Sequence, residues 1–116
     1  MIEPPLAAPD IILTLDRDGV IRDATLGGVF AAEVASYWIG LPWVATVPER
    51  DGLLLRRILG EVQARGFSPF RQLVQRLPSG REVAVEYTTL HLEGQQDYVA
   101  VGKSLQANAE IQCRLI

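Results

Sequence analysis

The chain has 116 residues, 48% of them hydrophobic and 22% charged, which fits one globular domain with one apolar core. Its basic residues, ten arginines and one lysine, are scattered through a sequence of net charge −3, which argues against direct nucleic-acid binding. No apolar run reaches the roughly 20 residues that cross a bilayer, and the N-terminus lacks the features of a signal peptide, so we expect no membrane contact and a cytoplasmic location. A single cysteine, Cys113, excludes an internal disulfide and a cysteine-based metal cluster.

The first quarter of the chain predicts a lead-in and a hairpin. Residues 1–9 hold three prolines and are expected to be irregular. Strands are predicted over residues 11–15 and 20–24, joined by the turn Asp16–Gly19, in which the glycine supplies a positive φ. A short helical segment containing Phe30 follows.

The longest helix is predicted from Asp51 to Arg65, with an apolar stripe at steps of four residues and Gly66 as its stop. Thr46 and Glu49 have the spacing of a capping box, which predicts that the Thr46 hydroxyl caps this helix.

The C-terminal third has three apolar runs separated by turn residues. The runs are Phe70–Leu77, Arg81–Leu92 and Tyr98–Leu105, a spacing that predicts an antiparallel meander. With the first hairpin, the meander predicts an α+β fold in which short helices cover one face of a five-stranded antiparallel sheet. This domain is expected to span residues 10–105.

Residues 106–116 are predicted to form an exit or linker helix. The segment is still apolar at Leu115, one residue before the sequence stops, so we expect the chain to be the start of a longer protein whose helix continues.

This order of elements, together with three segments, resembles the PAS domain over residues 9–116. The segments are Asp10–Ile21, Trp38–Val47 and Val99–Leu105. Parts of the sequence also resemble the N-terminal PAS domain of the PpsR/CrtJ repressors, which regulate photosynthesis genes in purple bacteria. These parts are Gly40–Val44, Val83–Tyr87 and Ala100–Leu105 running into Ala109–Gln112. The narrower resemblance implies a bacterial transcription regulator that binds DNA only through a downstream domain.

The PAS resemblance also bears on cofactors, and we expect none. Flavin-photoreceptor PAS domains carry a Gly-Arg-Asn-Cys motif, whereas the matching residues here are Gly40-Leu41-Pro42-Trp43. Trp43 cannot replace the thiolate of the photoadduct. The usual flavin-contacting glutamine of the last strand is matched by Gly102. His91, the only histidine, is a weak candidate for haem ligation compared with a surface position at the end of a strand.

A candidate pocket wall follows from the same resemblance, although no ligand is identified. Large aromatic side chains at this site can stack on a planar ligand, but they can equally fill the cavity themselves. The wall residues are Trp38, Trp43, Leu54, Ile58, Tyr87 and Gly102.

Self-association is expected because both faces of the last strand are partly apolar, so the second face needs a cover. We expect a homodimer, with a regulatory partner protein as a further candidate. Its contact candidates are Val83, Val85, Val99 and Val101 on the sheet and Ile111 and Leu115 on the exit helix. Cys113 is a redox candidate on that helix, although buried inert cysteines are commoner.

The expected function is a non-enzymatic PAS module for sensing and dimerisation in a multidomain signalling protein. It would pass the state of a ligand or partner through the exit helix. Two alternatives stay open: a small isomerase-like or hydratase-like enzyme on a cone-shaped α+β fold, and an interaction module without a ligand. A buried carboxylate behind Trp38 and Trp43 would favour the enzyme.

Overall fold

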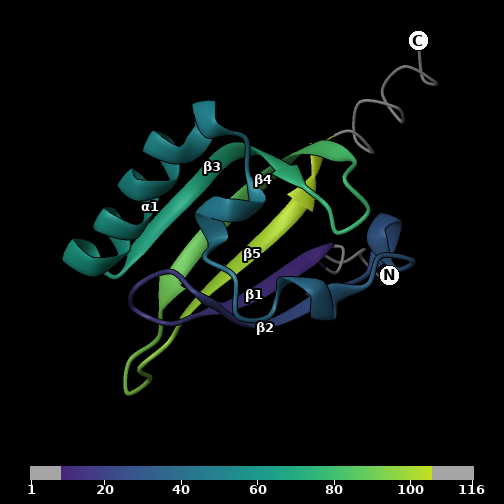
Figure 1. Ribbon diagram of the computed structural model, residues 1–116. Helices are drawn as coiled ribbons and strands as arrows, with labels where there is room; N and C mark the ends of the chain where they lie inside the picture. The colour runs from purple at the N-terminus through teal and green to yellow at the C-terminus, as the bar shows by residue number, and fades with distance from the viewer. Residues whose placement is uncertain (1–8, 106–116) are drawn as a thin grey trace, which may run out of the picture.

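Five strands form one antiparallel sheet in the order β2-β1-β5-β4-β3 in the computed structural model, which describes residues 9–105 (Figure 1). The two ends of the described chain meet at the centre of the sheet, because β1 pairs with β5. The strands are β1 (Ile11–Leu15), β2 (Ile21–Leu26), β3 (Phe67–Arg76), β4 (Glu82–His91) and β5 (Tyr98–Ser104).

One face of the sheet is covered by 3₁₀ turns and one longer helix (Figure 1). These elements are η1 (Gly28–Phe30), η2 (Ala35–Trp38), η3 (Trp43–Thr46), η4 (Glu49–Asp51) and α1 (Gly52–Arg65). Helix α1 packs on β3 and β4. The predicted α+β architecture, with its five antiparallel strands and its helices on one face, is confirmed.

Several predictions concern segments outside the described residues. These are the exit helix over residues 106–116, with Ile111, Cys113 and Leu115, and all but the last residue of the lead-in. Among residues 9–105, no helix combines the length and the apolar character that a membrane span requires.

The core lies between the inner face of the sheet and the helical layer. Alternate residues of β1, β4 and β5 are buried, as the period of two requires. The strands contribute Ile11, Leu13, Leu15, Ile21, Leu73, Val83, Val85, Tyr87, Tyr98 and Ala100 to this core, and Leu77, directly after β3, joins them. The helical layer contributes Phe30, Trp38, Trp43, Leu55, Ile58 and Val62.

The predicted capping box is wrong. The Thr46 hydroxyl donates to the carbonyl of Trp43 at 2.7 Å and so closes the short turn η3. Helix α1 begins at Gly52, after a separate 3₁₀ turn, so Thr46 lies too far upstream to cap it. The local spacing is correct for a cap, but Thr46 is instead drawn into the core by its tertiary contacts.

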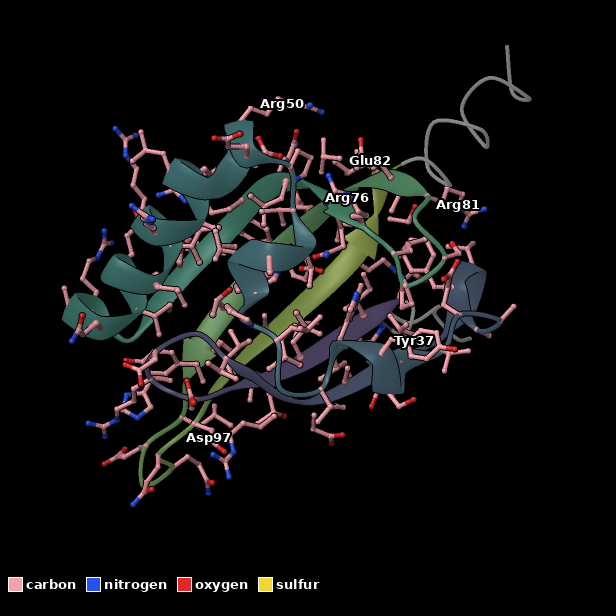
Figure 2. All side chains as sticks on the ribbon, in the orientation of Figure 1. Tyr37, Arg50, Arg76, Arg81, Glu82 and Asp97 are labelled. Carbon is pink, nitrogen blue, oxygen red and sulfur yellow. The ribbon has the colours of Figure 1, made fainter. Side chains whose placement is uncertain are left out.

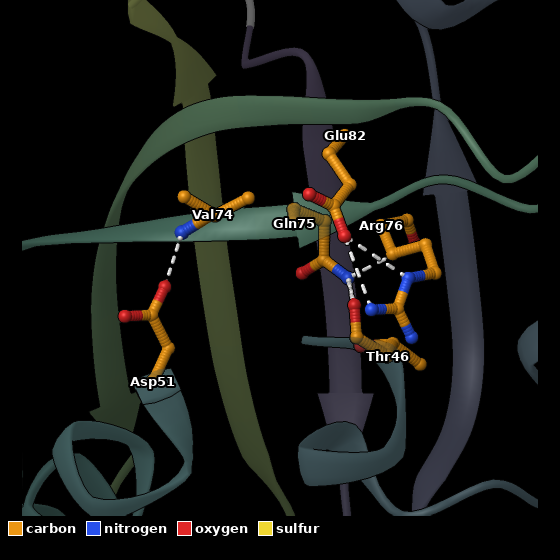
Figure 3. Close-up of polar contacts among 6 residues, drawn as sticks. All are labelled: Thr46, Asp51, Val74, Gln75, Arg76 and Glu82. Atoms are coloured by element: carbon orange, nitrogen blue, oxygen red, sulfur yellow. Dashed lines mark hydrogen bonds and ion pairs between the residues drawn. The ribbon is translucent and has the colours of Figure 1, made fainter. Parts of the chain in front are cut away.

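Helix α1 is tied to β3 at both ends. Near its start, the Asp51 carboxylate accepts the backbone N–H of Val74 at 2.8 Å (Figure 3). Near its end, the Glu61 carboxylate accepts the hydroxyl of Ser68 and the guanidinium of Arg71, whose Nε lies 3.2 Å away. The hydrogen bonds from Ser68 and Arg71 lower the pKa of Glu61.

The contact made by Glu61 predicts a pH-dependent contribution to stability. A lowered pKa in the folded state means that the ionised carboxylate stabilises the fold above its ordinary titration range, and that this stabilisation is lost as the pH falls through the folded value. We expect Glu61→Gln to lower the urea midpoint at neutral pH, and the difference from the wild type to narrow at acid pH. Glu93→Gln, in the exposed β4–β5 turn, is the control. An equal loss at both pH values would contradict this role for Glu61.

Candidate functional site

The centre of the cup formed by the sheet and helices holds the buried amide of Gln75, on the inner face of β3. Its oxygen accepts from Tyr87 Oη at 2.7 Å and from Trp43 Nε1 at 3.2 Å. Its nitrogen donates to the carbonyl and the hydroxyl of Thr46, both at 2.7 Å (Figure 3). One side chain therefore joins β3, β4 and η3, and both ends of its amide are satisfied.

The two aromatic partners of Gln75 also contact each other. The rings of Trp43 and Tyr87 meet edge to face, with centroids 4.9 Å apart and planes at 77°. Both side chains have no exposed surface. Burial raises the pKa of the Tyr87 phenol, so it remains a neutral donor to Gln75.

Gly102 on β5 makes room for this pair. A Cβ atom added to Gly102 would lie 2.7 Å from Cε1 of Tyr87 and 2.8 Å from Cγ1 of Val85. Contacts this short force neighbouring atoms to move. The missing side chain of Gly102 therefore leaves the space that the ring of Tyr87 occupies.

The predicted wall residues come together, but as parts of the core. Trp38, Trp43, Ile58 and Tyr87 are buried, and Leu54 packs against them while partly exposed. Aromatic rings and a glutamine thus occupy the centre of the cup, where the resemblance left open either a pocket or aromatic side chains that fill it.

Two members of this site, Gln75 and Thr46, were not predicted from the sequence. A signal for Gln75 was present, because it shares the inward phase of β3 with Leu73 and Leu77 and is therefore a polar residue at a core position. Thr46 had no comparable signal, since its spacing matched a helix cap.

Several ionisable residues that could carry chemistry have structural partners. Asp16 accepts the backbone N–H groups of Asp18 and Val20 in the first turn, and Glu82 pairs with Arg76 at 3.0 Å. His91 Nε2 lies 2.7 Å from the carbonyl of Gln95 in the β4–β5 turn. Among residues 9–105, no three metal-ligating side chains of the histidine, cysteine and carboxylate types gather in one place.

The outer face of the sheet is the second candidate surface. Val99 and Val101 lie half-buried on it, and the register places Leu90 and Thr88 beside them on β4. Val101 is also paired with Ile12 on β1. A band of half-buried, mostly apolar residues therefore crosses the three central strands on the side away from the helices.

The proposed contact residues Val83 and Val85 are not on this face, which corrects the prediction. Both are buried in the core. The register pairs Val85 with the buried Ser104, so the odd-numbered residues of β4 point inward. A one-residue difference in phase moves every side chain of a strand to the opposite face, and strand alternation alone does not fix which face is covered.

Two phenylalanines at the edge of the outer face were also not predicted. Phe67 pairs with Leu90, and the Arg65 guanidinium carbon lies 5.3 Å from the centroid of its ring. Phe70 sits in a bulge of β3 with φ +52° and is 72% exposed. Its backbone N–H is held by the hydroxyl of Thr88 at 3.1 Å.

Solved structures of PAS domains match this fold. The PAS domain of the RpfR quorum-sensing receptor of Cronobacter turicensis, in complex with BDSF, matches with a TM-score of 0.65 and 14% identity, covering 84% of this chain and 95% of that chain. The Drosophila melanogaster Cycle PAS-B domain with bound ethylene glycol matches with a TM-score of 0.67 and 9% identity, covering 82% of this chain and 99% of that chain. The PAS domain of an HTR-like protein from Haloarcula marismortui matches with a TM-score of 0.59 and 23% identity, covering 85% of this chain and 84% of that chain.

No protein-family model and no curated protein matches the sequence. The structural matches nonetheless cover 82% to 85% of this chain, and the fold of the described residues is that of a PAS domain. They give no support to the PpsR/CrtJ repressors in particular.

The amide network of Gln75 predicts a large loss of stability for Gln75→Leu. The variant keeps a similar volume but leaves Trp43 Nε1, the Tyr87 hydroxyl and Thr46 without their buried partner. We expect the free energy of unfolding to fall by roughly 3 kcal/mol. Gln72→Leu, at an exposed position of the same strand, should change it by less than about 0.5 kcal/mol. Similar losses for the two variants in urea denaturation would show that the network is unimportant.

The fit between Gly102 and Tyr87 predicts opposite effects for two glycine replacements. Gly102→Ala should destabilise the protein by about 2 kcal/mol, because the new methyl group overlaps the Tyr87 ring. Gly60→Ala should stabilise it by about 1 kcal/mol, since Gly60 lies in α1 and a Cβ there has no neighbour within 4 Å. Thermal unfolding of both variants measures the difference, and stabilisation by Gly102→Ala would be inconsistent with this packing.

Proposed function

We propose that this chain is a signalling module that acts by pairing with another protein through the outer face of its sheet, first of all with a second copy of itself. The observation that carries the proposal is the apolar band of Ile12, Val99 and Val101 on a face that no described helix covers. Exposed apolar surface of this kind is typical of protein contact sites. Pairing would set the relative position of the two chains, and their exit segments would pass that state on.

The strained backbone of Phe70 supports the same proposal. A bulky residue with positive φ is rare and costs roughly 1 kcal/mol, and here the side chain recovers little by burial because it is mostly exposed. Strain of this sort persists where a binding role maintains it. A partner that covers Phe70 and Phe67 would supply the missing apolar contact.

A ligand-sensing role is the second candidate. The RpfR domain, which shares the fold, was solved with BDSF bound. In this chain the hydroxyl of Thr89 on the inner face is buried without a hydrogen-bond partner within residues 9–105, and a ligand could satisfy it. Such a ligand would have to displace part of the Trp43, Gln75 and Tyr87 cluster, which weighs against it.

We also propose that the domain is not an enzyme. The buried polar side chains of the described residues are threonine, serine and glutamine, and each carboxylate that faces the helix–sheet junction has a hydrogen-bond partner. A catalytic acid or base would need a carboxylate in the cup with a perturbed pKa.

Mass spectrometry of the intact protein under native conditions tests the ligand alternative, since an unexplained mass would indicate a bound molecule.

The type of regulator rests on sequence resemblance. The segments around Gly40–Val44, Val83–Tyr87 and Ala100–Leu105 favour a bacterial transcription regulator of the PpsR/CrtJ type, acting in the cytoplasm and binding DNA through a further domain. A chromosomal deletion that changes the expression of photosynthesis genes in the source organism would support this assignment, and unchanged expression would oppose it.

The outer-face dimer predicts specific effects on self-association. In sedimentation velocity over about a hundredfold range of concentration, the wild type should move from monomer to dimer. Val101→Glu should raise the dissociation constant at least about tenfold, because it buries a charge at the centre of the interface. Phe70→Gly should weaken the dimer while the stability of the monomer stays within about 1 kcal/mol, because strain is relieved as side-chain contact is lost.

Val29→Glu provides the matched control for this experiment. Val29 is an exposed valine in η1, outside the band on the outer face. The control should dimerise like the wild type. A wild-type protein that remains a monomer at all concentrations, or a control that is weakened as much as Val101→Glu, would refute the proposed surface.

A further inference from the structure

A surface trough lies outside the cup, between η3, η4, the start of α1 and the end of β3. Its volume is about 570 Å³. In the 3₁₀ turn η3, Trp43 and Thr46 are three residues apart and both face the core, as the period of three requires. Val44 and Ala45 therefore face outward, where they line the trough.

The floor of the trough is apolar. Leu53 is 67% exposed on α1, although Leu55, Ile58 and Val62 of the same helix supply its buried stripe. Leu53 lies beside Val44 and Val47 in the lining of the trough. Gly52 also lines the trough, and a Cβ added to it would make an ordinary contact with Cγ2 of Val44 at 3.5 Å.

The rim of the trough is cationic. Arg56 and Arg76 line it, and Glu49 is the only acidic residue in the lining. The Arg76 guanidinium is paired with Glu82, but within residues 9–105 Arg56 has no ion pair.

The part of the sequence that contains the trough residues Arg56 and Arg76 also has an excess of positive charge. Residues 49–82 contain seven arginines and four carboxylates in a chain of net charge −3. Three of those carboxylates already accept hydrogen bonds from the protein. Figure 2 shows Arg50, Arg76, Arg81 and Glu82 at one end of the molecule and Asp97 at the other. Positive charge therefore exceeds negative charge in the segment that contributes Arg56 and Arg76 to the trough.

We propose that this trough docks a short acidic amphipathic helix of a partner protein. Apolar side chains of that helix would lie on Leu53, Val44 and Val47, and a carboxylate about one turn away would meet Arg56. The trough is open to solvent on one side, so a small molecule would stay largely exposed in it, whereas a helix needs to bury only one face. Charge complementarity with Arg56 requires that the partner be acidic.

The proposal is independent of the outer-face dimer. Trough and outer face lie on opposite sides of the sheet, so a partner helix could bind whether or not the chains pair.

The test uses two synthetic helical peptides with the 116-residue chain. Both are labelled peptides of about 14 residues with leucines at positions i, i+3, i+4 and i+7, and glutamates flank the leucines in one peptide and lysines in the other. Fluorescence anisotropy should show that the glutamate peptide binds more tightly, by roughly fivefold or more. Arg56→Glu should reverse this preference, while Arg57→Glu, at an exposed position of α1 outside the lining, should leave it unchanged.

Leu53→Ser should weaken both peptides about tenfold or more, because it removes an apolar anchor at an exposed position. Circular dichroism of each variant establishes that it is folded. Equal binding of the two peptides, or equal effects of Arg56→Glu and Arg57→Glu, would overturn the proposal. Displacement of the glutamate peptide by dodecanoic acid, lost in Arg56→Glu, would assign the trough to an anionic lipid and overturn the proposal in the same way.

Discussion

The amide of Gln75 is the contact on which the arrangement of this domain depends. It lies on the inner face of β3 and binds Trp43 and Thr46 of η3 and Tyr87 of β4, so that the sheet and the helical layer share one buried polar centre. A buried polar group is costly unless it is fully paired. Gln75 and its partners satisfy one another's hydrogen bonds, so the loss of either side would leave buried polar atoms unpaired. This network therefore favours a single packing of η3 over the sheet, and it fills the centre of the cup.

Because the centre of the cup is filled, the candidate binding sites lie on the surface of the domain. The outer face has an apolar band and the strained residue Phe70, and the trough beside α1 has an apolar floor with an uncompensated arginine. The trough is connected to the centre of the cup through η3 and β3, since Thr46 and Gln75 face the core while Val44 and Arg76 line the trough.

Much of the fold was predictable because its signals are local. Strand alternation, the turn Asp16–Gly19 and the stop at Gly66 depend on residues close in sequence, and all three appear as expected. The prediction that Thr46 caps α1 was wrong because the Thr46 side chain bonds to Trp43 and Gln75 in the core, and sequence spacing does not reveal these contacts. The assignment of Val83 and Val85 to the outer face failed because alternation defines two faces without saying which one the helices cover.

The sequence by itself determined the class of fold, the presence and order of the strands and the apolar stripe of α1, because periodicity and turn chemistry act over a few residues. Only the tertiary structure decided that Gln75 joins Trp43 and Tyr87, that Gly102 leaves space for the Tyr87 ring, and that Leu53 and Arg56 share a trough with Val44. These arrangements depend on the register between strands and on the seating of helices on the sheet. Both are set by packing between residues distant in sequence.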